Sequence, residues 1–358
     1  MVLLCNDPHN LVPCHHRQNR GNMGSGTIHY YVHGRGRGHG TRTLKITAAL
    51  EAAGVPVRLF SGADPLEMIR ASHSVEAVDS LLPSQPFAWA GLIFRRMRAA
   101  RGAIREDAPF ALISDGDLPS LLAAHLEKIP SIAVGHAEVF GETKRPGTVP
   151  RLPWLKEKLV AKISSLSATR HVAVNFVPTV PLNRHTVAAR PATAEIIRKQ
   201  PPAQDVVCYF RDDNGDAILD ALAATGLKVT LFSNTASPRE HIEVHPLDRA
   251  AFLLALADTR RVVASAGSQL LSECVAAGIP IFALYKQDDA EQRLNVAMLQ
   301  NAGLGEGMSF EAFTPSRLQK FIETSDEDST ASGASRTDNP VDEVVRHLIV
   351  SLRDNGHF

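Results

Sequence analysis

Short apolar runs rich in β-branched residues alternate along the chain with longer stretches of helical periodicity. In its first part this alternation predicts strands at residues 27–33, 55–60, 110–114 and 131–134, with helices at 43–53 and 118–128. Buried strands that alternate with helices form parallel sheets covered by helices. We therefore expect an α/β fold that begins with a βαβ unit.

The same pattern starts again in the second part of the chain. It predicts strands at residues 206–210, 228–232, 261–265 and 280–283 and helices at 216–225, 248–257 and 269–277. Pro181, Pro191, Pro201 and Pro202 separate the two series. Because 358 residues exceed the roughly 250–300 that one core supports, we expect two Rossmann-like domains.

The prolines and shifts in composition set the expected limits of these parts. They are a disordered extension at 1–22, an N-terminal domain at 23–190, a linker at 191–204, a C-terminal domain at 205–323, a flexible loop at 324–340 and a C-terminal helix at 341–358. The last helix has an apolar stripe that includes Val341, Val345 and Ile349. We expect this stripe to pack back on the first domain.

Composition excludes some functional classes. Thirty-eight basic residues balance 38 acidic ones, so no overall field favours a nucleic acid. No apolar run is long enough to span a bilayer, and four widely spaced cysteines favour a reducing compartment, so we expect a cytoplasmic protein. Residues 86–105 mix aromatic side chains with arginines, which suits either an ordinary amphipathic helix or peripheral contact with the inner face of a membrane.

A glycine-rich segment follows the first predicted strand. Residues 33–41 read His-Gly-Arg-Gly-Arg-Gly-His-Gly-Thr, and residues 8–50 contain no Asp or Glu. Exposed backbone N–H groups and nearby arginines suit an anion such as phosphate, although the spacing fits neither the dinucleotide fingerprint nor the P-loop. His39 is either a general base at this site or a solvated loop residue.

A second candidate site lies in residues 264–280, where a strand, a small-residue turn and a helix follow one another. The turn at Gly267 and Ser268 exposes helix N-terminal amides to a diphosphate, while Glu273 can accept hydrogen bonds from ribose hydroxyls. Polar side chains that suit sugar hydroxyls follow the next strand: Asp288, Asp289, Glu291, Gln292 and Asn295.

These segments resemble the GT-B glycosyltransferases, particularly the branch that forms lipid II and its bacterial relatives. The resemblance is carried by Gly36 to Gly40 in the first half and by Gly267, Glu273, Gly278, Pro280, Gln292 and Asn295 in the second. It implies two Rossmann-like domains around a cleft, with the acceptor on the first domain and a nucleotide-sugar on the second. Residues 210–215 depart from the family's glycine-rich loop, so Arg211 is either a phosphate contact or a surface residue.

The resemblance assigns roles to residues of this chain. It implies acceptor contacts from Gly36, Arg37, Gly38, Gly40 and Thr41. It implies donor contacts from Arg211, His245, Leu247, Gly267, Ser268, Gln269, Glu273, Asp288, Glu291 and Gln292. Uracil as the donor base follows from the analogy alone.

Catalysis would need a base that is oriented by a carboxylate. His39 is the expected base, and Asp115 or Asp117, at the end of a strand on the same rim, is the expected orienting group. A metal-binding Asp-x-Asp and a plain helix cap are the alternatives for these aspartates. We expect an inverting, metal-independent transferase of a hexose or N-acetylhexosamine. It would need no cofactor, since the nucleotide-sugar is a substrate. A nucleotide-sugar 2-epimerase of the same fold and a non-catalytic nucleotide-sugar-binding subunit are the alternatives.

Overall fold

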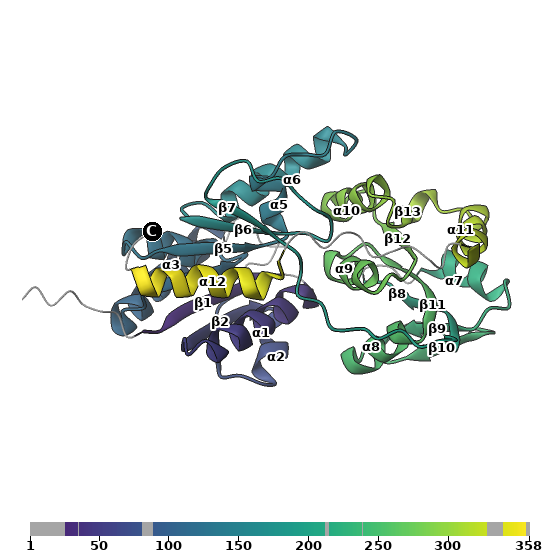
Figure 1. Cartoon of the computed structure of the whole chain (residues 1–358), viewed down its shortest axis with the longest axis horizontal. Helices are drawn as coiled ribbons and strands as arrows, with labels where there is room; N and C mark the ends of the chain where they lie inside the picture. The colour runs from purple at the N-terminus through teal and green to yellow at the C-terminus, as the bar shows by residue number, and fades with distance from the viewer. Residues whose placement is uncertain are drawn as a thin grey trace, which may run out of the picture.

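The computed structural model describes residues 26–34, 36–80, 89–211, 215–237, 239–327 and 339–355. It contains two parallel sheets, each flanked by helices, in two halves that lie side by side (Figure 1). The predicted 1–22 extension lies outside the described residues.

The first half is built on a parallel sheet of seven strands, in the order β3-β2-β1-β4-β5-β6-β7. Its elements are β1 (Ile28–Gly34), α1 (Arg37–Ala52), β2 (Val57–Ala63), α2 (Pro65–Arg70), β3 (Val75–Ala77), α3 (Trp89–Asp107), β4 (Ala111–Asp115), α4 (Leu118–Leu126), β5 (Ser131–Gly135), α5 (Ala137–Glu142), α6 (Arg151–Ser164), β6 (Arg170–Val174) and β7 (Thr186–Ala189). The central strands β1, β4 and β5 are buried on both faces, which explains their continuous apolar runs.

The second half contains a parallel sheet of six strands, in the order β10-β9-β8-β11-β12-β13. Its elements are β8 (Gln204–Tyr209), α7 (Asp216–Ala223), β9 (Val229–Phe232), β10 (Ile242–His245), α8 (Arg249–Ala257), β11 (Thr259–Ser265), α9 (Ser268–Ala277), β12 (Ile281–Tyr285), α10 (Ala290–Asn301), β13 (Glu306–Ser309), the 3-10 turn η2 (Phe310–Ala312) and α11 (Pro315–Glu327). Both sheets therefore have the strand order of a Rossmann fold.

The last helix, α12 (Val341–Asn355), returns to the first half. Val341, Val345 and Ile349 are buried in the core of the first half, where α12 packs against α1, β6 and β7, and the backbone N–H of Val341 donates to the carbonyl oxygen of Arg190 at 2.9 Å. Figure 1 shows α12 lying across this half, far in sequence from the strands it covers.

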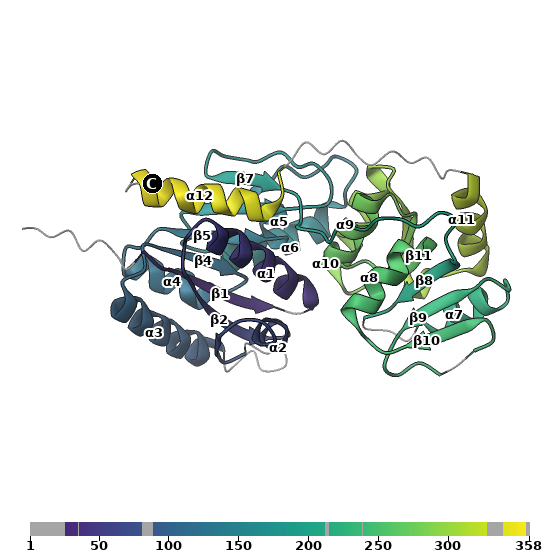
Figure 2. The ribbon, with the colours of Figure 1, turned by 60° about the horizontal axis from the view of Figure 1, so that its bottom comes forward.

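Apolar packing and polar bonds join the two halves. One apolar cluster contains Phe140 and Phe176 of the first half together with Met298 of α10. Residues 191–203 run between the halves without helix or strand. In Figure 2, helices α8, α9 and α10 lie on the side of the second half that faces the first.

The structure corrects several predicted elements. The first helix begins at Arg37 and not at residue 43, so most of the glycine segment is a helical turn rather than a loop. Helix α11 continues to Glu327, into the range expected to be a flexible loop, of which residues 328–338 lie outside the described residues. Residues 141–153, for which no element was predicted, contain the end of α5, a short connection with buried Val149 and the start of α6. Within the described residues, no helix combines the length and apolar character needed to cross a membrane.

Candidate active site

A cavity of about 480 Å³ lies between the two halves. Residues that follow β1, β4 and β5 line one side, and residues that follow β8, β10 and β11 line the other. The carboxyl ends of parallel strands meet at such an edge, and ligands of open α/β sheets bind there. The volume is within the usual range for a small-molecule site, about 300–1,000 Å³.

His39 projects into this cavity from the first turn of α1, with 27% of its side chain exposed. Its Nδ1 lies 2.8 Å from Oδ1 of Asp115, the last residue of β4. Asp115 is ionised, so it accepts a hydrogen bond from Nδ1–H, and this leaves Nε2 of a neutral ring without a proton. The pair has the arrangement of a base and the group that orients it.

Arg42 holds the other side of the Asp115 carboxylate. Its Nε donates to Oδ2 and its Nη2 to Oδ1, both at 2.8 Å, and both side chains are buried. Burial opposes ionisation of Asp115, but Arg42 and His39 outweigh it and lower its pKa to about 2. Asp115 therefore stays charged at any pH at which the base acts.

Asp117 has a different role. It is the N-cap of α4, where its Oδ2 accepts from the backbone N–H of Ser120 at 3.0 Å, and its Oδ1 pairs with the buried Arg96. It does not line the cavity. Of the two aspartates left open by the sequence, the structure pairs Asp115 with His39 and uses Asp117 as a helix cap, so Asp115 is the one placed to orient the base.

Two glycines make room for this arrangement. A Cβ on Gly34 would stand 2.6 Å from Cε1 of His39 and nearer still to Nε2, so the imidazole can occupy its position only above a glycine. Gly116 has φ of +75°, and a Cβ there would overlap the carbonyl oxygen of His33. The close approach of β1 and β4 thus brings His39 and Asp115 together.

The predicted acceptor residues divide into three groups. Gly36, Gly38 and Thr41 line the cavity. Gly40 is buried away from it, and a Cβ on Gly40 would lie 2.5 Å from Sδ of Met68, so this glycine allows α1 to pack closely on α2. The Arg37 side chain and all of Arg35 lie outside the part of the chain that the structure describes.

The opposite wall of the cavity begins at the N-terminus of α9. Gly267, Ser268 and Gln269 line it there. The first N–H groups of a helix have no partner within the helix and carry the positive end of its dipole, which favours a diphosphate. A Cβ on Gly38 would lie 3.4 Å from Cβ of Gln269, so the N-terminal turns of α1 and α9 meet across the cavity.

Glu273 is buried one turn further along α9 and lines the same wall. Its two carboxylate oxygens receive the two terminal nitrogens of Arg249, one at 3.0 Å, and Nε2 of Gln269 donates to Oε1 at 2.9 Å. The carboxylate is therefore fixed in place, with lone pairs left for further donors.

A second charged group lies where β8 and β12 end. Arg211 lines the cavity and pairs with Oδ2 of Asp289 at 3.0 Å. Asp289 caps α10 by accepting from the backbone N–H of Gln292 at 2.9 Å. Glu291 and Gln292 also line the cavity, whereas Asp288 is exposed and does not.

An apolar wall completes the second side. Leu247 lines the cavity together with Tyr209, Phe232 and Phe252, whose rings pack edge to face. His245 stands behind this wall, with its ring 5.6 Å from that of Phe232, and pairs with Glu243 at 3.0 Å. His245 does not line the cavity, and its predicted contact with the donor stays a prediction.

Comparison with known proteins shows the family to which this chain belongs. The sequence pattern described as glycosyl transferase family 1 matches residues 64–325. The chain belongs to this family. A comparison of this glycosyltransferase with curated protein sequences gives no match.

Solved structures of low identity show the fold of this glycosyltransferase. MurG of Acinetobacter baumannii has a TM-score of 0.65 at 15% identity, covering 91% of this chain and 99% of that one. The glycotransferase of kitacinnamycin has a TM-score of 0.61 at 17% identity, covering 92% and 96%. The UDP-GlcNAc 2-epimerase of Neisseria meningitidis has a TM-score of 0.58 at 10% identity, covering 91% and 99%. The predicted GT-B fold and the resemblance to GT-B glycosyltransferases are confirmed.

Several cavity residues of the glycosyltransferase escaped prediction. Arg249 follows the cap Asp248 in an otherwise apolar helix, and nothing in its sequence context marks it as the partner of Glu273. His136 lines the cavity, with Nδ1 3.0 Å from the carbonyl oxygen of Val174 and Nε2 2.7 Å from Oδ1 of Asn295 in the other half. Its position directly after the buried strand β5 was the available signal.

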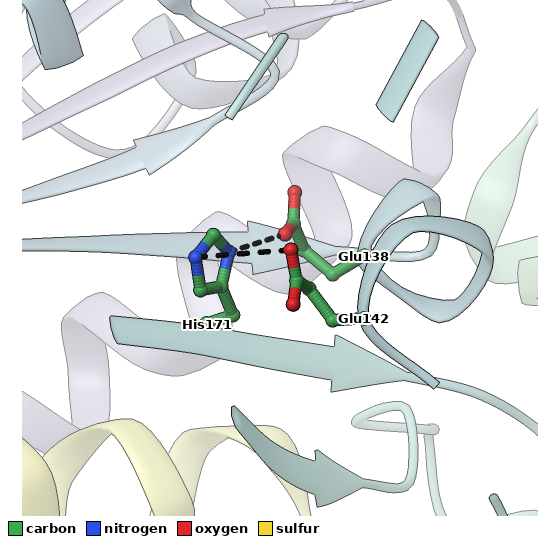
Figure 3. Close-up of side chains that lie close together, drawn as sticks. All are labelled: Glu138, Glu142 and His171. Carbon is green, nitrogen blue, oxygen red and sulfur yellow. Dashed lines mark hydrogen bonds and ion pairs between the residues drawn. The ribbon is translucent and has the colours of Figure 1, made fainter. Parts of the chain in front are cut away.

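One group of side chains beside the cavity has the composition of a metal site. Glu138 and Glu142 of α5 lie beside His171 of β6, as Figure 3 shows. Oε2 of Glu138 accepts from Nδ1 of His171 at 2.7 Å, and Glu142 receives Lys162 at 2.5 Å and Asn183 at 3.1 Å. Burial raises the pKa of Glu138. Since these polar atoms already bind one another and Lys162 brings a positive charge, we interpret the group as a structural network that joins α5, α6 and β6.

Proposed function

We propose that this glycosyltransferase transfers a hexose or N-acetylhexosamine, with inversion, from a UDP-sugar to an acceptor hydroxyl. The observation that carries the proposal is the His39–Asp115 pair, which lies in one cavity with the N-terminus of α9. The pair supplies a base, and the helix terminus supplies a site for the leaving diphosphate.

The acceptor hydroxyl would bind on the first half, beside Gly36, Gly38 and Thr41. Its proton passes to Nε2 of His39 while its oxygen bonds to the anomeric carbon of the sugar. The bond from that carbon to the diphosphate oxygen breaks, and the diphosphate leaves with both electrons. Because the oxygen attacks opposite the leaving group, one displacement inverts the anomeric centre.

Asp115 would stabilise the imidazolium that forms on His39. Its carboxylate is charged and fixed by Arg42, so it meets the new positive charge without rearrangement. General-base catalysis of this kind contributes about 10²–10⁴-fold.

The second half would hold the donor. The N-terminus of α9 and Arg211 would meet the diphosphate, and this fixed positive potential would take the place of a metal ion. Glu273, held by Arg249 and Gln269, would accept hydrogen bonds from the ribose hydroxyls. The apolar wall of Tyr209, Phe232, Leu247 and Phe252 suits a flat base.

Donor choice is tested by thermal denaturation with UDP, GDP, dTDP and their sugars, for the wild type and for Glu273→Ala. A ligand at about 100 times its Kd adds about 2.7 kcal/mol to the free energy of unfolding. We expect stabilisation by UDP and UDP-sugars, and a smaller effect in Glu273→Ala. Asp288→Ala, an exposed residue outside the cavity, is the matched control and should respond as the wild type.

If no nucleotide stabilises the wild type, the proposed class of donor is wrong. If Glu273→Ala responds as the wild type does, the donor does not bind at Glu273. Product analysis separates the alternative activity: an epimerised nucleotide-sugar in the absence of acceptor would identify an epimerase.

A further inference from the structure

The outer face of α6 exposes apolar side chains to solvent. Leu152, Leu155, Leu159 and Ile163 follow at helical spacing and are 81%, 62%, 62% and 53% exposed. The opposite face is buried, with the Trp154 ring packed edge to face on Phe140 of α5, 5.2 Å between ring centres. The helix therefore has two apolar faces: the inner face forms part of the core, and the outer face is an apolar stripe that the described residues leave uncovered.

Basic residues border this stripe. Arg151, Lys158 and Lys162 lie along one edge of the helix, and Lys156 lies along the other. Lys162 also pairs with Glu142 at 2.5 Å. The one acidic residue of α6, Glu157, points away from the stripe toward α10, and burial and then Glu291 raise its pKa. The outer face thus combines an apolar centre with positively charged margins.

We propose that the outer face of α6 binds the surface of an anionic lipid bilayer, with the helix lying in the plane of the interface. The leucines and Ile163 would enter the boundary between headgroups and acyl chains, and the basic side chains would reach the lipid phosphates. This inference goes beyond the proposed function and does not depend on it.

The positive charge of the outer α6 face favours an anionic lipid surface over a second copy of the chain as its partner. Two α6 faces packed together would bring Arg151, Lys156 and Lys158 of each copy close to those of the other, with no acidic residue on the face to balance them. Partner proteins usually fill a pocket with an aromatic anchor. The stripe is aliphatic and stands out from the surface, which suits a fluid headgroup layer that needs no matching shape.

Residues 86–105, for which the sequence suggested peripheral membrane contact, are a weaker candidate for the lipid-binding surface. In α3, Arg96 is buried with Asp117, and Arg101 and Arg105 both pair with Glu127. Among the α3 side chains that the structure describes, Phe94 is the one large apolar residue that is exposed, at 60%, so α3 has no apolar stripe like that of α6.

The test is co-sedimentation of the full chain with vesicles of phosphatidylcholine alone or with about one third phosphatidylglycerol. We expect binding to the anionic vesicles, little to the neutral ones, and weakening at about 0.5 M salt. Leu155→Glu/Leu159→Glu should weaken binding at least about tenfold, as should Lys156→Glu/Lys158→Glu. Because the replaced side chains are exposed or at the surface, the variants should keep the melting temperature of the wild type.

Matched controls come from the second half. Leu254→Glu changes a leucine of α8 that is 67% exposed, and Lys228→Glu/Lys320→Glu makes the same change of charge; both should bind vesicles as the wild type does. No binding of the wild type to anionic vesicles, or equal binding by the α6 variants, would overturn the proposal. So would sedimentation velocity showing a wild-type dimer that Leu155→Glu/Leu159→Glu converts to monomer, with vesicle binding unchanged. No sugar donor enters the assay, so its failure leaves the proposed function standing.

Discussion

Replacing Asp115 by Asn tests the charges around His39. Asp115 is 1% exposed and accepts hydrogen bonds from Arg42 and His39. The substitution keeps the size of the side chain but removes its charge, so the buried Arg42 loses its counter-ion. Removing one partner of a buried ion pair costs about 3–5 kcal/mol. We expect the free energy of unfolding of Asp115→Asn to fall by about that amount at neutral pH.

The effect should depend on pH in a defined direction. Burial raises the pKa of Asp115, but Arg42 and then His39 lower it to about 2, from an ordinary value of 3.8. Because the folded pKa is the lower one, the stabilisation is fully present well above pH 3.8 and is lost as the pH falls toward 2. At about 1.36 kcal/mol per unit of pKa difference, this stabilisation is on the order of 2 kcal/mol, of which about 1 kcal/mol is lost by about pH 3.

Urea unfolding followed by circular dichroism measures this difference. The difference in free energy of unfolding between the wild type and Asp115→Asn should decrease by about 1 kcal/mol between about pH 7 and about pH 3. Asp79→Asn, an exposed aspartate 3.6 Å from Arg95, is the control and should change stability by less than about 0.5 kcal/mol. An Asp115→Asn protein as stable as the wild type at neutral pH, or a gap independent of pH, would refute the account of this pair.

Four further outcomes are expected. Gly34→Ala should displace the His39 ring and lower transfer at least about 100-fold with donor affinity unchanged; unaltered transfer would show that the ring position is not needed. Asn295→Ala leaves buried His136 without its acceptor and should lower the free energy of unfolding by about 1–3 kcal/mol in urea titrations, whereas no change would argue against this link. Ile349→Ala in α12 should cost about 2–5 kcal/mol in the same assay, and a smaller loss than Ile349→Val would contradict the packing. Transfer should persist in excess EDTA; activity lost there and restored by Mn²⁺ would contradict metal independence.

The central strands could be predicted because burial on both faces of a parallel sheet leaves continuous apolar runs, as in β5 and β12. The start of α1 could not, because glycines are poor helix formers and the turn at Gly36 to Gly40 is held by tertiary contacts of His39 and Arg42 with Asp115. Helix α6 was missed because apolar residues lie on two of its faces with charged residues between them, so its sequence does not show a single apolar stripe.

The candidate site was predicted in part. His39 and Glu273 stood out because their residue types follow strand ends in segments rich in small residues. Their partners are separated from them by 76 and 24 positions in the sequence, and periodicity gives no information on contacts at that distance. Asp115 and Asp117 have the same residue type and the same rim position, so only the folded chain distinguishes the residue beside His39 from the helix cap.

The central claim is that His39 acts on the acceptor while the second half binds the donor. Its most direct test is His39→Ala, measured by calorimetric titration of UDP-sugar and by the rate of transfer to acceptor. The account predicts an unchanged Kd for the donor and a rate lower by about 10²–10⁴-fold. Donor affinity lost in parallel with the rate, or transfer at the wild-type rate, would contradict it.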